Sequence, residues 1–137
     1  CAMFVSTLLV WVGSKHARLG ARWHYCPTMV NDAMHGLNGL RAIARDLKLV
    51  GTGDIVLFDW GRDGVADHVG FYIDDAWFRA EAPELRVATI QRFGLLGPGE
   101  FWALEGNTAP DADSDGGEVM IRRRSLSDVR LFARVAA

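Results

Sequence analysis

The chain has 137 residues, of which half are apolar and 23% are charged. This length and composition predict a single globular domain over residues 1–137, with a core that needs neither a disulfide framework nor a structural metal. Fifteen Lys and Arg residues against seventeen Asp and Glu residues leave a net charge of −2. Nucleic acid is therefore not expected as the main partner, because a phosphate-binding protein carries a basic excess. The longest apolar run, residues 7–12, is far shorter than the roughly 20 residues that cross a bilayer, so membrane insertion is not expected.

The first third of the chain is predicted to be helical. Apolar side chains recur there at steps of one, three and four, which is typical of a helix with one broad apolar face: Phe4, Val5, Leu8, Leu9 and Val12. Gly13 and Ser14 should end that helix. A second helical region is predicted over residues 28–47, with Thr28 as its N-cap and with Gly36 and Gly39 dividing it into two short helices.

From Gly51 onward the pattern changes to short β-branched or alternating runs separated by turns. The strands predicted in this way are residues 54–58, 68–73, 88–92, 101–105, 118–123 and 130–135. Helices followed by strands, without βαβ alternation, predict an α+β domain in which helices pack on one face of an antiparallel sheet of about five to six strands.

Cys1 is the first candidate for chemistry, because it precedes the apolar helix directly. The unpaired N–H groups and partial positive charge of a helix N-terminus favour a thiolate, which is the nucleophilic form of cysteine. A cysteine nucleophile also needs a base within hydrogen-bond reach and a third group that orients the base. Taken alone, Cys1 could equally be a buried thiol with a structural role. The second cysteine, Cys26, is predicted to be a small buried core residue.

Four histidines could act as the base: His16, His24, His35 and His68. Only His68 opens a predicted strand directly after a turn, where its ring could project from the sheet into a cleft. The other three fall in or beside helical stretches, where a surface or capping role is the simpler interpretation.

Glu105 and Asn107 could supply the orienting group, because both stand at the end of a predicted strand. Residues i and i+2 of a strand face the same side, so both side chains could point into one cleft. A carboxylate that accepts a hydrogen bond from one imidazole nitrogen leaves the other nitrogen able to act as a base. Taken alone, Glu105 could equally be a solvated strand end.

Four ordered segments resemble the blocks of a known family: CAMFVS at residues 1–6, GDIVLFD at 53–59, DHVG at 67–70 and EGNT at 105–108. They are similar to the CHAP domain, the cysteine- and histidine-dependent amidohydrolase/peptidase family of the NlpC-type papain-like hydrolases. The likeness spans essentially the whole chain and is strongest to the CHAP modules of bacteriophage endolysins.

The resemblance implies a papain-like fold in which Cys1 is the nucleophile, His68 is the general base, Glu105 orients the imidazole and Asn107 supports the site. It implies hydrolysis, through a thioester, of an amide of the stem or cross-bridge peptide of peptidoglycan or of the N-acetylmuramoyl–L-alanine link. The expected protein is a monomer that needs no cofactor, has bacterial peptidoglycan as its partner, and acts from the host cytoplasm on the host cell wall during lysis.

A departure from the family at the start of the sequence leaves alternatives open. Family members carry a segment before the nucleophile, whereas this sequence begins at Cys1, which predicts a fragment of a longer lysin. A terminal Cys1 also permits an N-terminal-nucleophile amidohydrolase. A non-catalytic wall-binding module of the same fold is the alternative from another class.

The remaining features are assigned mainly structural roles. Most of the five Trp residues are expected in the core, but Trp60 and Trp102 flank the site blocks and are candidate substrate-binding residues. The basic run 122–124 is predicted to be a solvated face. The acidic loops at 59–67 and 111–116 match a calcium-binding loop only in part, so solvated turns are the better interpretation and no metal is assigned.

Overall fold

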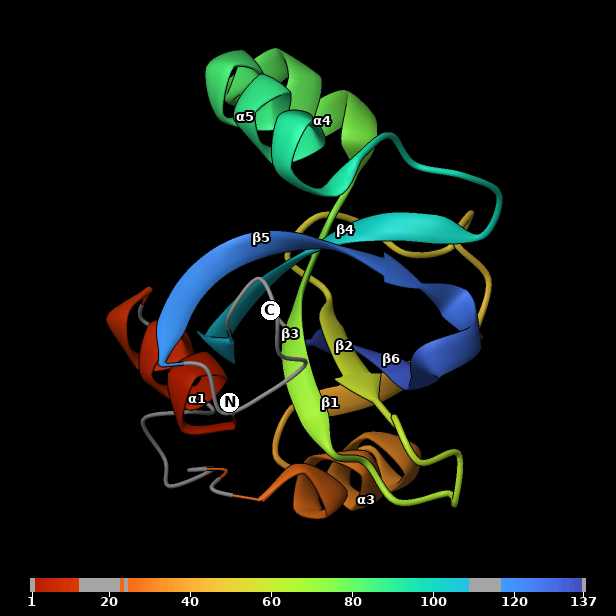
Figure 1. Cartoon of the computed structure of the whole chain (residues 1–137). Coiled ribbons are helices and arrows are strands. Elements are labelled where there is room, and N and C mark those ends of the chain that lie inside the picture. Colours follow the sequence, from red (N-terminus) through yellow and green to blue (C-terminus); the bar gives the residue numbers. More distant parts are fainter. Residues whose placement is uncertain (1, 13–22, 24, 109–116, 137) are drawn as a thin grey trace.

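The computed structural model describes residues 2–12, 23, 25–108 and 117–136 (Figure 1). In chain order its elements are α1 (Ala2–Trp11), α3 (Cys26–His35), β1 (Leu40–Ile43), β2 (Ile55–Phe58), β3 (His68–Ile73), α4 (Asp75–Glu81), α5 (Pro83–Phe93), β4 (Glu100–Thr108), β5 (Glu118–Ser125) and β6 (Val129–Val135), with a 3-10 turn at Leu126–Asp128. The strands form one antiparallel sheet in the order β1-β6-β2-β3-β4-β5. The α+β class and the antiparallel sheet are as predicted from the sequence.

Less than half of the region predicted to be helical, residues 28–47, is helix. The helix α3 begins at Cys26, with Pro27 in its first turn, so Thr28 is not the N-cap. It ends at Gly36, whose left-handed φ of 66° closes the helix. The second predicted helix is wrong: Leu40–Ile43 form β1, because their backbone groups find partners along β6.

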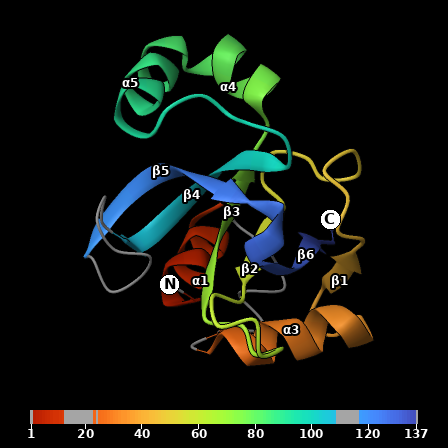
Figure 2. The same ribbon diagram turned by 45° about the vertical axis from the view of Figure 1, so that its right-hand side comes forward.

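Five of the six predicted strands are confirmed as β2, β3, β4, β5 and β6. The predicted strand at residues 88–92 is wrong, because these residues belong to α5. Together α4 and α5 form an insertion between β3 and β4, and Figure 2 shows them side by side above β4 and β5. Local signals for these helices exist: the Asp74 side chain accepts a hydrogen bond from the N–H of Trp77, and Pro83 occupies the first turn of α5.

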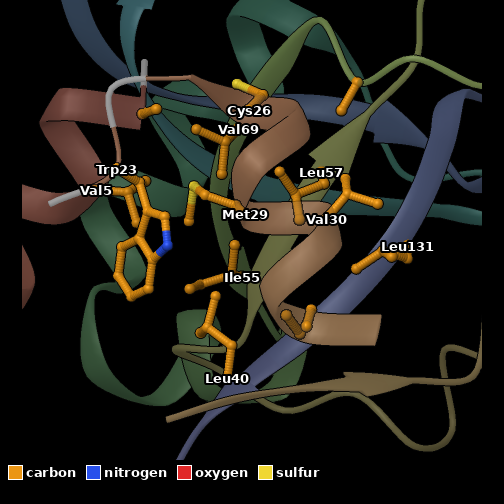
Figure 3. Packing of buried hydrophobic residues seen from close by; sticks show 14 of the residues in the cluster. Val5, Trp23, Cys26, Met29, Val30, Leu40, Ile55, Leu57, Val69 and Leu131 are labelled. Carbon is orange, nitrogen blue, oxygen red and sulfur yellow. The ribbon is translucent and has the colours of Figure 1, made fainter. Parts of the chain in front are cut away.

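The sheet is apolar on both faces. On one face α1 and α3 cover a cluster that includes Val5, Met29, Leu57 and Val69, and Figure 3 shows several of these side chains gathered between α3 and the strands. On the other face lies a second cluster, whose buried members are Val50, Val56, Phe58, Tyr72, Phe101, Ala103, Val129 and Phe132. Because successive residues of a strand point to opposite faces, these two clusters fix the face to which each site residue belongs.

Among the described residues, no helix is both long enough and apolar enough to span a membrane.

Candidate active site

The loop before β3 is held by Asp59, which follows β2. Its carboxylate accepts hydrogen bonds from the backbone N–H groups of Gly64, at 2.7 Å, and Asp63, at 3.3 Å. Burial alone would raise the pKa of Asp59, but these N–H groups outweigh it and lower the pKa. The loop thus leads into His68 with a fixed geometry. No three His, Cys, Asp or Glu side chains gather as a metal site within the described ranges, and residues 111–116 lie outside them.

His68 and Glu105 meet in the interior. The Nε2 atom of His68 lies 2.8 Å from the Oε1 atom of Glu105, and both side chains are fully buried. Phe71 pairs with Leu104, and Gly70 and Glu105 are the next residues along β3 and β4. A Cβ atom at Gly70 would lie 2.9 Å from the Glu105 Cγ atom and 2.8 Å from the carbonyl oxygen of Leu104. Gly70 therefore makes the room that Glu105 occupies beside His68.

Arg124, from β5, holds both oxygens of the same carboxylate. Its Nε donates to Oε2 of Glu105 at 2.6 Å, and its Nη2 donates to Oε1 at 2.5 Å. The prediction of a solvated face at residues 122–124 is wrong for Arg122 and Arg124, which are buried; only Arg123 is exposed. The alternation of a strand explains the difference, because residues i and i+2 turn toward the same side. That alternation was the signal available in the sequence.

Arg124 keeps Glu105 ionised. Burial alone would raise the pKa of Glu105, but the hydrogen bonds from Arg124, and then the one from His68, outweigh it and lower the pKa. An ionised carboxylate can only accept hydrogen bonds, so the proton between His68 and Glu105 belongs to Nε2. The other ring nitrogen, Nδ1, is buried and has no hydrogen-bond partner among the described residues. A ring held in this way can offer Nδ1 as a base.

The helix α1 lies against the two strands that carry His68 and Glu105, but on their other face. It contacts β3 and β4, and the ring of Phe4 sits where a Cβ of Gly106 would be. Gly106 and Glu105 are neighbours on one strand and therefore face opposite sides. Cys1 itself, and the side chain of Asn107, lie outside the described residues.

The two candidate tryptophans have different surroundings. Trp60 is half-buried and stacks on Phe58, with ring centroids 4.7 Å apart, and its centroid lies 6.0 Å from that of His68. Trp102 is fully buried, and its indole N–H donates to Asp75. The prediction that Trp102 binds substrate is therefore not supported: no part of its side chain reaches the surface, and it belongs to the core under α4 and α5.

Cys26 behaves as the sequence predicted. Its side chain is buried in the cluster beneath α1 and α3, and burial raises the pKa of its thiol. A thiol that is held protonated in the core is a poor nucleophile, so Cys26 does not compete with Cys1 for the catalytic assignment.

An apolar groove of about 310 Å³ runs beside the loop that leads into β3. One wall comes from α3 and includes Pro27, Val30 and Met34, and the other comes from residues 64–66. Its far wall is thus two residues from His68 along the chain. No sequence pattern indicated the groove, because its walls come together only in the folded chain.

Fold and site together define an α+β protein with a buried imidazole–carboxylate–guanidinium chain across three neighbouring strands. Comparisons with models of protein families, with curated proteins and with solved structures found no match.

Proposed function

We propose that this protein is a cysteine hydrolase of bacterial peptidoglycan in which Cys1 is the nucleophile, His68 the base and Glu105 the group that orients His68. The observation that carries the proposal is the buried bond between Glu105 and Nε2 of His68, which leaves Nδ1 without a partner among the described side chains. The second support is α1, which begins one residue after Cys1 and contacts the strands of both His68 and Glu105, on the face opposite these two side chains.

The chemistry follows from those roles. Nδ1 of His68 takes the thiol proton of Cys1, and the thiolate attacks the carbonyl carbon of an amide. N–H groups in the first turn of α1 stabilise the resulting oxyanion. The C–N bond then breaks, the leaving amine takes the proton from Nδ1, and a thioester remains. Water, deprotonated by Nδ1, hydrolyses the thioester and regenerates the thiol. No step needs a resident cofactor.

The substrate class rests on the resemblance of the four ordered segments to CHAP domains of phage endolysins. It points to an amide of the stem or cross-bridge peptide, or to the N-acetylmuramoyl–L-alanine link, with Asn107 as a polar support of the site. The apolar groove beside the loop before β3 offers a place for a peptide chain. Trp60 is the remaining aromatic candidate for contact with substrate.

The test uses purified peptidoglycan, with turbidity as the rate and mass spectrometry of the released fragments as the identification of the cleaved bond. Cys1→Ala and His68→Gln should each lower the rate by about 10³-fold or more. Cys26→Ala is the matched control, because it removes a buried core thiol, and it should retain the wild-type rate. New amino termini in the fragments identify an amidase or peptidase.

Other outcomes contradict the proposal in distinct ways. New reducing sugar ends would identify a glycosidase. Binding to peptidoglycan without cleavage, unaffected by Cys1→Ala, would identify a wall-binding module of the same fold. Loss of activity when one residue is added before Cys1 would identify an N-terminal-nucleophile hydrolase, because a papain-like site does not use the α-amino group.

A further inference from the structure

We infer that Arg124 is the positioning residue of the site: by holding both oxygens of Glu105, it fixes the orientation of the His68 ring. The inference rests on the proposed function for the role of His68 as a base and adds a residue to that site. It starts from the contacts of Glu105, which accepts two hydrogen bonds from Arg124 and one from His68.

Such a residue is needed because the carboxylate group of a Glu side chain can rotate about its terminal torsion. The terminal torsion of a Glu side chain is broad, so one hydrogen bond to His68 does not define the plane of the carboxylate of Glu105. A guanidinium presents two parallel N–H groups that match the two oxygens and hold that plane. Oε1 of Glu105 is shared by Arg124 and His68, so the position that Arg124 imposes is passed directly to Nε2.

Arg124 is itself held in place by the aromatic side chains that flank His68. Its guanidinium carbon lies 4.6 Å from the ring centroid of Trp60 and 5.5 Å from that of Phe58. The same two rings lie 6.0 Å and 5.9 Å from the His68 ring. The arginine and the histidine therefore pack against one aromatic pair while both bind Glu105, and a shift of one side chain displaces the others.

A charge requirement alone is the competing explanation, because Glu105 is buried and needs a cation nearby. Arg124→Lys separates the two explanations. Lysine keeps the positive charge but is a point donor that cannot hold both oxygens in one plane. Arg124→Met leaves Glu105 without this cation and can prevent folding, so the double variant Glu105→Gln/Arg124→Met, which removes both charges, replaces it.

The experiment combines kinetics with a spectroscopic signature that does not depend on activity. NMR spectra of ring-¹⁵N-labelled histidine show which nitrogen of His68 carries the proton. We expect Arg124→Lys to change the Nε2 and Nδ1 resonances of His68 and to lower kcat by up to about 100-fold with KM unchanged. The double variant should show the same change while remaining folded. Arg123→Lys is the matched control on the same strand, and it should change neither readout.

The inference is overturned if the His68 resonances of Arg124→Lys are the same as those of the wild type. It is also overturned if these resonances change while kcat does not. If the wild-type protein hydrolyses no peptidoglycan while the His68 resonances still respond to Arg124→Lys, the proposed function fails and the positioning of the ring by Arg124 stands.

Discussion

The contact between Gly106 and Phe4 decides how α1 lies against the site strands, and Gly106→Ala tests it. A Cβ at residue 106 would lie 2.4 Å from Cγ of Phe4 and 2.8 Å from both Cδ atoms. The ring, or α1 with it, must retreat by about 1 Å to reach an ordinary contact distance of 3.4 Å. Overpacking of this kind costs about 1–3 kcal/mol. Alanine would otherwise stabilise a strand position by about 0.5–1 kcal/mol relative to glycine.

Thermal unfolding measures this cost, with an expected loss of about 4 °C in Tm per kcal/mol for a chain of this length. Phe4→Ala provides the matched background, since it removes the ring that the new methyl group meets. In that background Gly106→Ala should be neutral or slightly stabilising, which gives a coupling free energy of about 1–3 kcal/mol. An equal loss in both backgrounds, or no loss in the wild type, would refute the assigned contact.

Three further predictions follow from charge and burial. Folding lowers the pKa of Glu105; its carboxylate therefore stabilises the fold above its ordinary pKa of 4.5, and that contribution is lost as pH falls through the lowered pKa. Tm should thus fall more steeply toward acid in the wild type than in Glu105→Gln, and parallel curves would contradict this. Burial raises the pKa of Cys26, so in Cys1→Ala the folded protein should react with iodoacetamide far more slowly than the unfolded chain; equal rates would place the thiol outside the core. Asp75→Asn weakens the acceptor for Arg86 and Trp102 and should cost about 1–2 kcal/mol in urea unfolding, whereas an unchanged midpoint would show that these bonds add nothing.

Local patterns predicted much of the fold. The runs of β2 and β3 are strong signals because these strands bury all of their side chains, and the spacing of α1 is a strong signal because one face of the helix packs on the sheet. The errors fall where tertiary pairing outweighs local preference. Residues 40–43 become β1 because β6 offers them hydrogen-bond partners, and residues 88–92 become helix because α5 packs with α4 over Trp102.

The site was predictable in part for the same reason. His68 begins β3 and Glu105 lies in the second half of β4, which continues to Thr108 beyond the predicted end, and the antiparallel pairing of β3 with β4 brings the two side chains together. Arg124 was missed because a short basic run is read as solvent-exposed, and its partner lies 19 residues earlier on the neighbouring strand. Trp102 was misassigned because closeness in sequence to Glu105 does not place two side chains in one site: strand alternation puts residues 102 and 105 on opposite faces of β4.

By itself, the sequence determined most of the elements and the residue types that could carry the chemistry, because periodicity acts over a few neighbouring positions. Only the tertiary structure decided which face each side chain occupies and which charges meet. The buried contact of Arg124 with Glu105 depends on strand register, and register is set by the packing of both faces of the sheet at once.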